Sequence, residues 1–92
     1  MVDEAVAHYQ QALDLCPEED LTRKAAILNT MALVIAQQGD IDRALELWQQ
    51  SLEIQERIGD VKGKAATLAN VAYWAGERGD RTQQLELKLG DP

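Results

Sequence analysis

The sequence predicts an all-α protein made of antiparallel helical hairpins that stack side by side. Good helix formers dominate the composition, with 13 Ala and 12 Leu among 92 residues, whereas Val and Ile together number only 10 and Phe is absent. The dipeptide Gly-Asp occurs at 39–40, 59–60 and 79–80, and again at 90–91. The first three pairs are therefore spaced by 20 residues, which accommodates a helix of about four turns and its connecting turn.

Each Gly-Asp pair is typical of the joint between two helices. Glycine just past a helix end can adopt the left-handed conformation, and the following Asp can accept hydrogen bonds as the N-cap of the next helix. Because a chain of this length suits one hydrophobic core, we expect residues 1–92 to form a single domain. Together with Pro17, the joints predict five helices, at 3–16, 21–38, 41–57, 61–78 and 82–89.

The chain also repeats itself with a period of about 40 residues. The segment KAAIL at 24–28 recurs as KAATL at 64–68, and DEAV at 3–6 recurs as DRAL at 42–45. Self-similarity of this period is typical of a helical solenoid. The pattern predicts about two and a half repeats: an outer helix at 3–16, a repeat at 21–57, and a repeat at 61–89 whose last helix is degenerate or forms a cap.

The distribution of apolar residues separates inner from outer helices. The second and fourth predicted helices contain MALVIA at 31–36 and VAYWA at 71–75, which are apolar nearly all round. A helix of that kind is buried on several sides, so we expect these two to be the inner helices. The third helix has a narrower stripe that includes Ala44, Trp48 and Leu52, as expected of an outer helix.

These residues resemble the tetratricopeptide repeat family, in its longer-helix form with a period near 40 residues. Small residues in the family's pattern allow two helix backbones to approach, and an aromatic residue fills the space between layers. Leu28 stands where the family usually has Trp, and Glu56 where it usually has Pro. HEAT repeats have a similar period, but the stripe of small, aromatic and small residues favours the tetratricopeptide pattern. That stripe is present as Ala44-x3-Trp48-x2-Ser51 and Ala5-x3-Tyr9-x2-Ala12, and the inner-helix frame as Leu28-x2-Met31-Ala32-x2-Ile35 and Leu68-x2-Val71-Ala72-x2-Ala75.

Charge and composition exclude several classes of partner. Nine basic against sixteen acidic side chains give a net charge of −7, which disfavours nucleic acid and anionic membranes because both require clustered Lys and Arg. No apolar run reaches the length of a membrane span, and no signal peptide is visible. The single cysteine, Cys16, suits a reducing compartment. We therefore expect a cytoplasmic protein that binds neither nucleic acid nor membrane.

The titratable residues do not assemble into a catalytic or metal-binding motif. His8 is the only histidine, and phosphotransfer at His8 is a third hypothesis. The sequence disfavours it, because no Lys or Arg lies one turn away to stabilise a phosphate group. Acidic residues follow Cys16, whereas a reactive thiol requires an electropositive neighbourhood. We expect no enzymatic activity, no cofactor and no metal.

The resemblance implies a protein–protein interaction module whose inner helices line a groove for a peptide or helix of a partner. The alternative for the groove residues is structural, with asparagines that bridge neighbouring helices and apolar residues that belong to the core. The candidate groove residues are Asn29, Leu33, Gln37, Asn70, Tyr73 and Glu77.

The first predicted helix suggests a second function. It lacks an inner helix before it and should expose an apolar face, which in a small protein tends to be an interface. The chain is then a homo-oligomer, with or without exchange of a terminal helix (a helix-swapped form), or a fragment of a longer array. The candidate self-association residues are Val2, Val6, Tyr9 and Leu13. In this alternative the protein is a structural self-assembling unit without a separate ligand.

Overall fold

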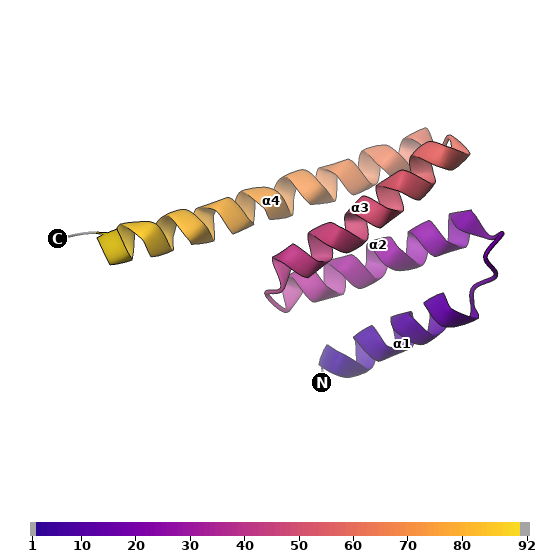
Figure 1. Ribbon diagram of the computed structural model, residues 1–92, viewed down its shortest axis with the longest axis horizontal. Coiled ribbons are helices and arrows are strands. Elements are labelled where there is room, and N and C mark those ends of the chain that lie inside the picture. Colours follow the sequence, from indigo (N-terminus) through magenta and orange to yellow (C-terminus); the bar gives the residue numbers. More distant parts are fainter. Residues whose placement is uncertain (1, 91–92) are drawn as a thin grey trace.

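The structure is a computed structural model that describes the backbone of residues 2–90 and the side chains of residues 4–80. Residues 2–90 contain helices and turns but no strand, which confirms the all-α prediction. The helices number four in this range, not the five that were predicted (Figure 1). They are α1 (Val2–Leu15), α2 (Leu21–Gln37), α3 (Ile41–Ile58) and α4 (Val61–Gly90).

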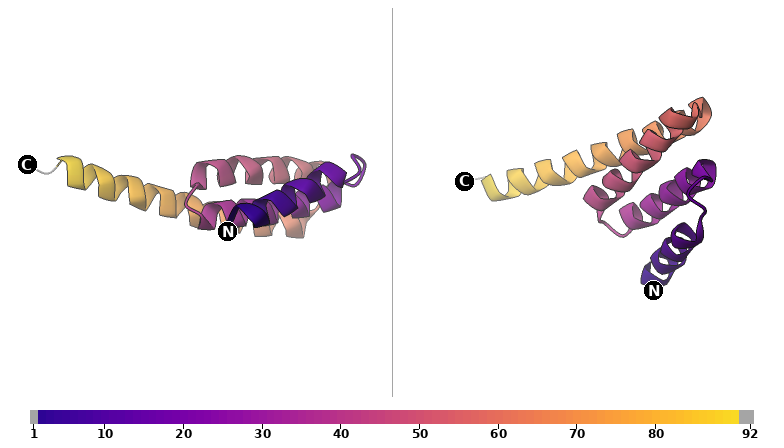
Figure 2. Two further views of the ribbon diagram at one scale, coloured as in Figure 1. Left: turned by 90° about the horizontal axis from the view of Figure 1, so that it is seen from below. Right: turned by 45° about the vertical axis from the view of Figure 1, so that its right-hand side comes forward.

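The helices are arranged around α2 and α3, which form the most extensively packed hairpin. Helix α4 packs mainly against α3 and also touches α2, whereas α1 packs against the other side of α2 (Figure 1). Seen from below, α3 lies in one layer, and α2 and α4 lie in the other (Figure 2). Helices α2 and α4, which the sequence predicts as the inner pair, therefore share one layer, with α3 in the other.

The core lies between α2 and α3. Its buried members come from both helices, and each is at most 2% exposed. Ala32 and Ala44 have no side chain beyond Cβ, so the two helix backbones approach closely, and Trp48 fills the adjoining space. Ser51 completes the predicted stripe by donating a hydrogen bond from its hydroxyl to the Ala25 carbonyl at 3.0 Å. The core cluster consists of Leu28, Met31, Ala32, Ile35, Ala36, Ala44 and Trp48.

Two of the predicted Gly-Asp joints are confirmed. Gly39 and Gly59 have φ angles of 101° and 72°, a left-handed conformation that glycine adopts without a Cβ penalty. Asp40 then caps α3 by accepting a hydrogen bond from the Arg43 amide at 3.3 Å. Asp60 caps α4 in the same way, with the Gly63 amide at 3.0 Å.

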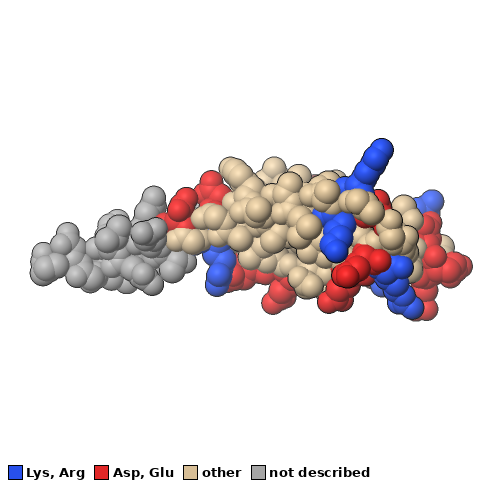
Figure 3. Space-filling view, turned by 90° about the horizontal axis from the view of Figure 1, so that it is seen from above, with Lys and Arg blue, Asp and Glu red and all other residues tan. Residues whose placement is uncertain are grey.

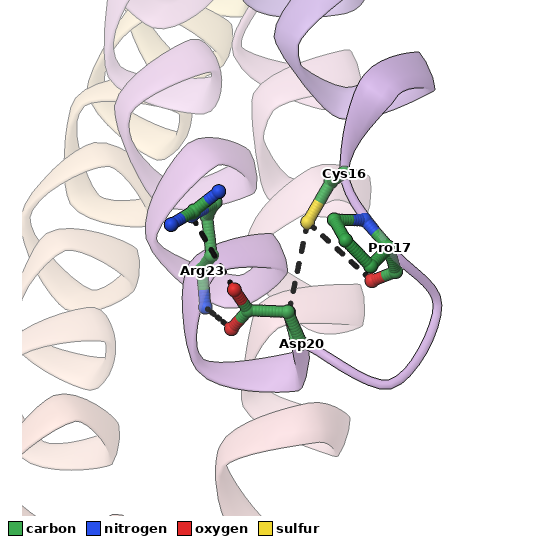
Figure 4. Close-up of polar contacts among 4 residues, drawn as sticks. All are labelled: Cys16, Pro17, Asp20 and Arg23. Carbon is green, nitrogen blue, oxygen red and sulfur yellow. Dashed lines mark hydrogen bonds and ion pairs between the residues drawn. The ribbon is translucent and has the colours of Figure 1, made fainter.

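A third capped start follows α1, at the beginning of α2 (Figure 4). Asp20 accepts a hydrogen bond from the Arg23 amide at 3.2 Å, and the Arg23 Nε atom lies 3.4 Å from the other carboxylate oxygen. The Cys16 thiol donates to the carbonyl oxygens of Pro17 and Asp20, both at 3.6 Å. Cys16 therefore helps to close the turn between α1 and α2, and its neighbours in this turn are acidic or neutral.

The third joint, Gly79-Asp80, is where the prediction is wrong. Helix α4 runs without interruption from Val61 to Gly90, so the predicted turn at 79–80 and the separate helix at 82–89 are not found. Gly79 does not have a positive φ angle, so the chain is not turned aside there. A glycine inside a helix costs about 1 kcal/mol relative to alanine but leaves the i→i−4 hydrogen bonds intact. As a result, α4 extends beyond the ends of α2 and α3 (Figure 1) and no helix folds back on it within residues 2–90.

Candidate functional site

A polar cluster centred on Asn29 joins three of the helices. The Trp48 indole nitrogen on α3 donates to the side-chain oxygen of Asn29 (Oδ1) at 2.6 Å. The side-chain nitrogen of Asn70 on α4 donates to the same oxygen at 3.2 Å. The Asn29 amide nitrogen donates in turn to the Thr67 hydroxyl at 3.4 Å. Thr67 is fully buried, and its hydroxyl donates a hydrogen bond to the Gly63 carbonyl at 3.0 Å. Asn29 therefore fixes α2 to both α3 and α4.

This cluster also sets the register of the two inner helices. Because α3 reverses the chain between them, α2 and α4 run in the same direction (Figure 1). Leu33 follows Asn29 by four residues, and Tyr73 follows Asn70 by three, so each lies about one turn further along its helix. Leu33 and Tyr73 therefore each lie about one turn beyond the Asn29–Asn70 hydrogen bond, on helices that run in the same direction.

The side chains on this side differ in their exposure. Leu33 is half-buried and packs against the core cluster, whereas Tyr73 is 61% exposed. The Tyr73 ring meets the Trp74 ring edge to face, with 5.2 Å between centroids and an interplanar angle of 87°. One turn beyond them, Gln37 is exposed and Glu77 is half-buried.

The six candidate groove residues therefore fall into three groups. The two asparagines bond to each other and hold the inner helices together, Leu33 and Glu77 are half-buried, and Tyr73 and Gln37 are open to solvent. Thr67 and the indole of Trp48 also belong to the Asn29 cluster but were not predicted as site residues. A signal for the second exists, since a buried Trp needs an acceptor for its indole N–H and Asn29 is available on the neighbouring helix. We call the six residues the inner-helix face: Asn29, Leu33, Gln37, Asn70, Tyr73 and Glu77.

The four candidate self-association residues lie on α1. Val6, Tyr9 and Leu13 are half-buried and pack against the core cluster, so they form the contact between α1 and α2. The side chain of Val2 lies outside the described residues. The predicted apolar face of this helix is therefore partly covered by the protein itself.

Helix α4 carries an open apolar surface that was not predicted. Val61 and Leu68 are 78% and 46% exposed, and Ala65, Ala72 and Ala75 are exposed beside them. Viewed from above, the described part shows a broad uncharged area, and the charged side chains lie mostly along its lower edge and at its right-hand end (Figure 3). The sequence predicts a covering helix at 82–89, whereas these residues continue α4 instead.

Among residues 4–80, charged side chains form a few exposed ion pairs. Arg78 on α4 forms an ion pair with Asp42 on α3, and Lys64 lies 4.0 Å from Glu56, all with exposed side chains whose pairing stabilises little. His8 is exposed on α1. In the part of the chain that the structure describes, no group of three or more His, Cys, Asp or Glu side chains could hold a metal. None of the helices within residues 2–90 combines the length and apolar character that crossing a membrane requires.

Comparison with known proteins agrees with this architecture. The family model for the tetratricopeptide repeat matches residues 23–83, which is more than half of the chain. The chain is also 30% identical over 82 residues to the photosystem I assembly protein Ycf3 of Acaryochloris marina (strain MBIC 11017). That alignment covers 89% of this chain but only 46% of the relative, so the chain spans about half of its length. No solved structure gives a significant match. On the evidence of its repeats, its helical hairpin and the family-model match over residues 23–83, the chain belongs to the tetratricopeptide repeat family.

Proposed function

We propose that the protein is an interaction module that binds a peptide or helix of a partner protein on the inner-helix face. Tetratricopeptide repeat domains bind protein partners in general, which supports the class of function. The observation that carries the choice of surface is the exposed Tyr73 ring, which like Leu33 lies about one turn beyond the Asn29–Asn70 hydrogen bond that joins α2 to α4. An exposed aromatic side chain on a rigid base is typical of the residues that dominate protein interfaces.

The face also indicates the chemistry of the partner segment. Tyr73 and Leu33 offer an apolar contact, and Gln37 and Glu77 one turn later offer a hydrogen-bonding group and a negative charge. A segment with one apolar anchor, followed within a turn by a polar or basic residue, satisfies both. The face contains no Lys or Arg, so a partner that presents an acidic group or a terminal carboxylate there is disfavoured.

The relative named above is an assembly protein, and a role in bringing protein subunits together agrees with an interaction module. The relative is about twice as long as this chain, so this agreement extends only to the class of function. The partner remains defined by the chemistry of the inner-helix face.

The test compares partner recovery by three forms of the chain. Tyr73→Glu changes the exposed ring, and Gln50→Glu on α3 is the matched control, because Gln50 is exposed and lies off the face. We expect partners that co-purify with the wild type and with Gln50→Glu to be lost with Tyr73→Glu, while all three have the same circular dichroism spectrum. If folded Tyr73→Glu retains every partner, the proposed surface is wrong.

The second candidate function is structural self-assembly. The exposed apolar side chains of α4 favour it, because an uncovered apolar patch on a small protein tends to be an interface. In that case the α4 surface, and not the inner-helix face, carries the function.

A further inference from the structure

Helix α4 leaves open the face that its repeat counterpart α2 buries. Residues of α4 correspond to those of α2 at an offset of 40, and the matched residues differ sharply in burial. Leu28 is 1% exposed in the core, whereas its counterpart Leu68 is 46% exposed. Ala25 and Ala32 are buried, whereas their counterparts Ala65 and Ala72 are exposed. The difference arises because α3 covers α2, and no helix in the described part of the chain covers this side of α4.

Helix α1 in turn leaves open a side that its repeat counterpart α3 buries. Its residues correspond to those of α3 at an offset of 39, and α3 is the helix that covers α2. On α3, Ser51 is fully buried and Ile54 packs against the core cluster. On α1, their counterparts Ala12 and Leu15 are exposed, Leu15 by 75%. Helix α1 packs against α2 through the side that carries Val6 and Leu13, so the side that carries Ala12 and Leu15 stays open.

Within the chain, the α2–α3 hairpin buries Leu28, Ala32 and Ser51, and their counterparts Leu68, Ala72 and Ala12 are exposed. Tyr9, the counterpart of Trp48, instead packs within the chain against the core cluster. We infer that α4 of one copy packs antiparallel against α1 of a second copy and reproduces the α2–α3 hairpin between chains. The occupant of the open α4 face is thus a second copy of this chain. This contact lies on a different side of α4 from the inner-helix face and does not depend on the function proposed for it.

Charge supports both the pairing and its direction. Residues 2–20, which contain α1 and the turn after it, carry six acidic residues and no Lys or Arg. The first turn of α4 carries Lys62 and Lys64. In an antiparallel pair the end of α1 lies beside the start of α4, so the acidic turn of one copy meets the lysines of the other.

The contact also accounts for most of the exposed apolar residues. Of the five large hydrophobic side chains that are exposed in the described part of the chain, Leu15, Val61 and Leu68 lie on the two faces. Burial of apolar surface is the main driving force for association. Because each copy offers two different faces, the contact does not close on itself as a symmetric dimer does, and further copies can add at both ends.

A cysteine pair tests this geometry directly. Within the chain the Ser51 hydroxyl lies 3.0 Å from the Ala25 carbonyl, so their counterparts Ala12 and Ala65 should lie side by side across the contact. The single variants Ala12→Cys and Ala65→Cys are made in a Cys16→Ser background, given different mass tags, mixed and oxidised mildly. We expect a disulfide-linked dimer that contains one chain of each kind, and at least fivefold less of either homodimer.

The control replaces Ala7, which is exposed on α1 and whose counterpart on α3 is the exposed Glu46. An Ala7→Cys chain mixed with Ala65→Cys should give at least fivefold less of the mixed dimer. If Ala65→Cys alone gives as much dimer as the mixture, two α4 helices meet each other and the inference is overturned. Equal cross-linking through Ala7→Cys and Ala12→Cys also overturns it, because random collision then explains the product.

Sedimentation of the unmodified 92-residue chain gives an independent readout. We expect its average mass to rise with concentration in the micromolar range, and Leu68→Glu to shift this rise to at least tenfold higher concentration. Leu68 is half-exposed, so this variant should keep the helical circular dichroism of the wild type. A wild-type chain that stays monomeric up to 200 μM overturns the inference. Tyr73→Glu should leave the association unchanged, which separates this contact from the proposed partner surface.

Discussion

Replacement of Asn29 by alanine should destabilise the protein far more than replacement of a half-exposed polar residue ordinarily does. The Asn29 carbonyl oxygen is the acceptor for the indole N–H of Trp48, whose side chain is fully buried in the core cluster. Asn29→Ala removes that acceptor and leaves the indole N–H without another hydrogen-bond acceptor among the described residues. The same substitution removes the hydrogen bond that the Asn29 amide nitrogen donates to the hydroxyl of Thr67 on α4, and Thr67 is also fully buried.

The magnitude follows from these contacts. A buried donor left without a partner costs about 1–3 kcal/mol, and each further hydrogen bond lost costs about 0.5–1.5 kcal/mol. The bond to Asn70 is partly exposed, so water recovers much of its contribution. We therefore expect Asn29→Ala to lower the free energy of unfolding by about 2–4 kcal/mol. A domain of this size has roughly 5–14 kcal/mol in total.

Urea denaturation followed by circular dichroism at 222 nm measures this loss, and the neighbouring residue provides the control. The Thr30 hydroxyl donates to the Ala26 carbonyl of its own helix at 3.0 Å, and the residue is exposed. Thr30→Ala should change the free energy of unfolding by less than about 0.5 kcal/mol, as surface substitutions usually do. At a typical urea slope, Asn29→Ala should lower the midpoint by roughly 2 M.

A double-mutant cycle with Trp48→Phe identifies the cause. Phenylalanine has no N–H group, so Asn29→Ala in that background no longer leaves a buried donor unpaired. We expect the cost of Asn29→Ala to fall by about 1–2 kcal/mol there. An equal cost of Asn29→Ala in both backgrounds would refute the assigned role of the Trp48–Asn29 hydrogen bond.

The remaining predictions concern glycines, a cap and one buried amide, and all are measured as urea midpoints. Gly63→Ala should cost about 1–3 kcal/mol, because its Cβ would lie 2.9 Å from Gln55 Nε2 and overlap the Asp60 carboxylate. Gly79→Ala, with open space around it, should instead stabilise α4 by up to about 1 kcal/mol; equal effects of the two would contradict this. Asp40→Ala should cost about 1 kcal/mol through loss of the α3 cap. Gln55→Leu should gain about 1 kcal/mol, since the buried Oε1 atom has no partner among the described residues; a loss would contradict that reasoning.

The turns show how far local sequence can predict this fold. At Gly39 and Gly59 the prediction holds because the signal is local: glycine permits the positive φ angle and the next Asp supplies the cap. Gly79-Asp80 carries the same dipeptide, yet α4 continues through it. A turn also needs a following helix that can pack back. After Asp80 the leucines stand at 85, 87 and 89, a spacing of two that does not form one stripe on a helix.

The helix that carries the candidate residues was predictable from the sequence, whereas their bonding was not. A period of 3.6 residues puts Asn29, Leu33 and Gln37 on one side of a helix, and the structure has α2 over Leu21–Gln37. Which groups the Asn29 amide meets depends on how closely α3 and α4 approach. That approach is fixed by Ala44, by Gly63 and by the packing of the whole hairpin, so Thr67 as a partner could not be predicted from spacing alone.

The two tryptophans give the protein a pair of built-in optical probes. The indole of Trp48 is sealed in the core and hydrogen-bonded, so it should emit at short wavelength and resist quenching by acrylamide until the chain unfolds. The ring of Trp74 is half-buried and touches Tyr73, so ligands that cover this tyrosine should alter its emission. The variant Trp74→Phe then reports on unfolding through Trp48, and the variant Trp48→Phe reports on ligand binding through Trp74, without any attached dye.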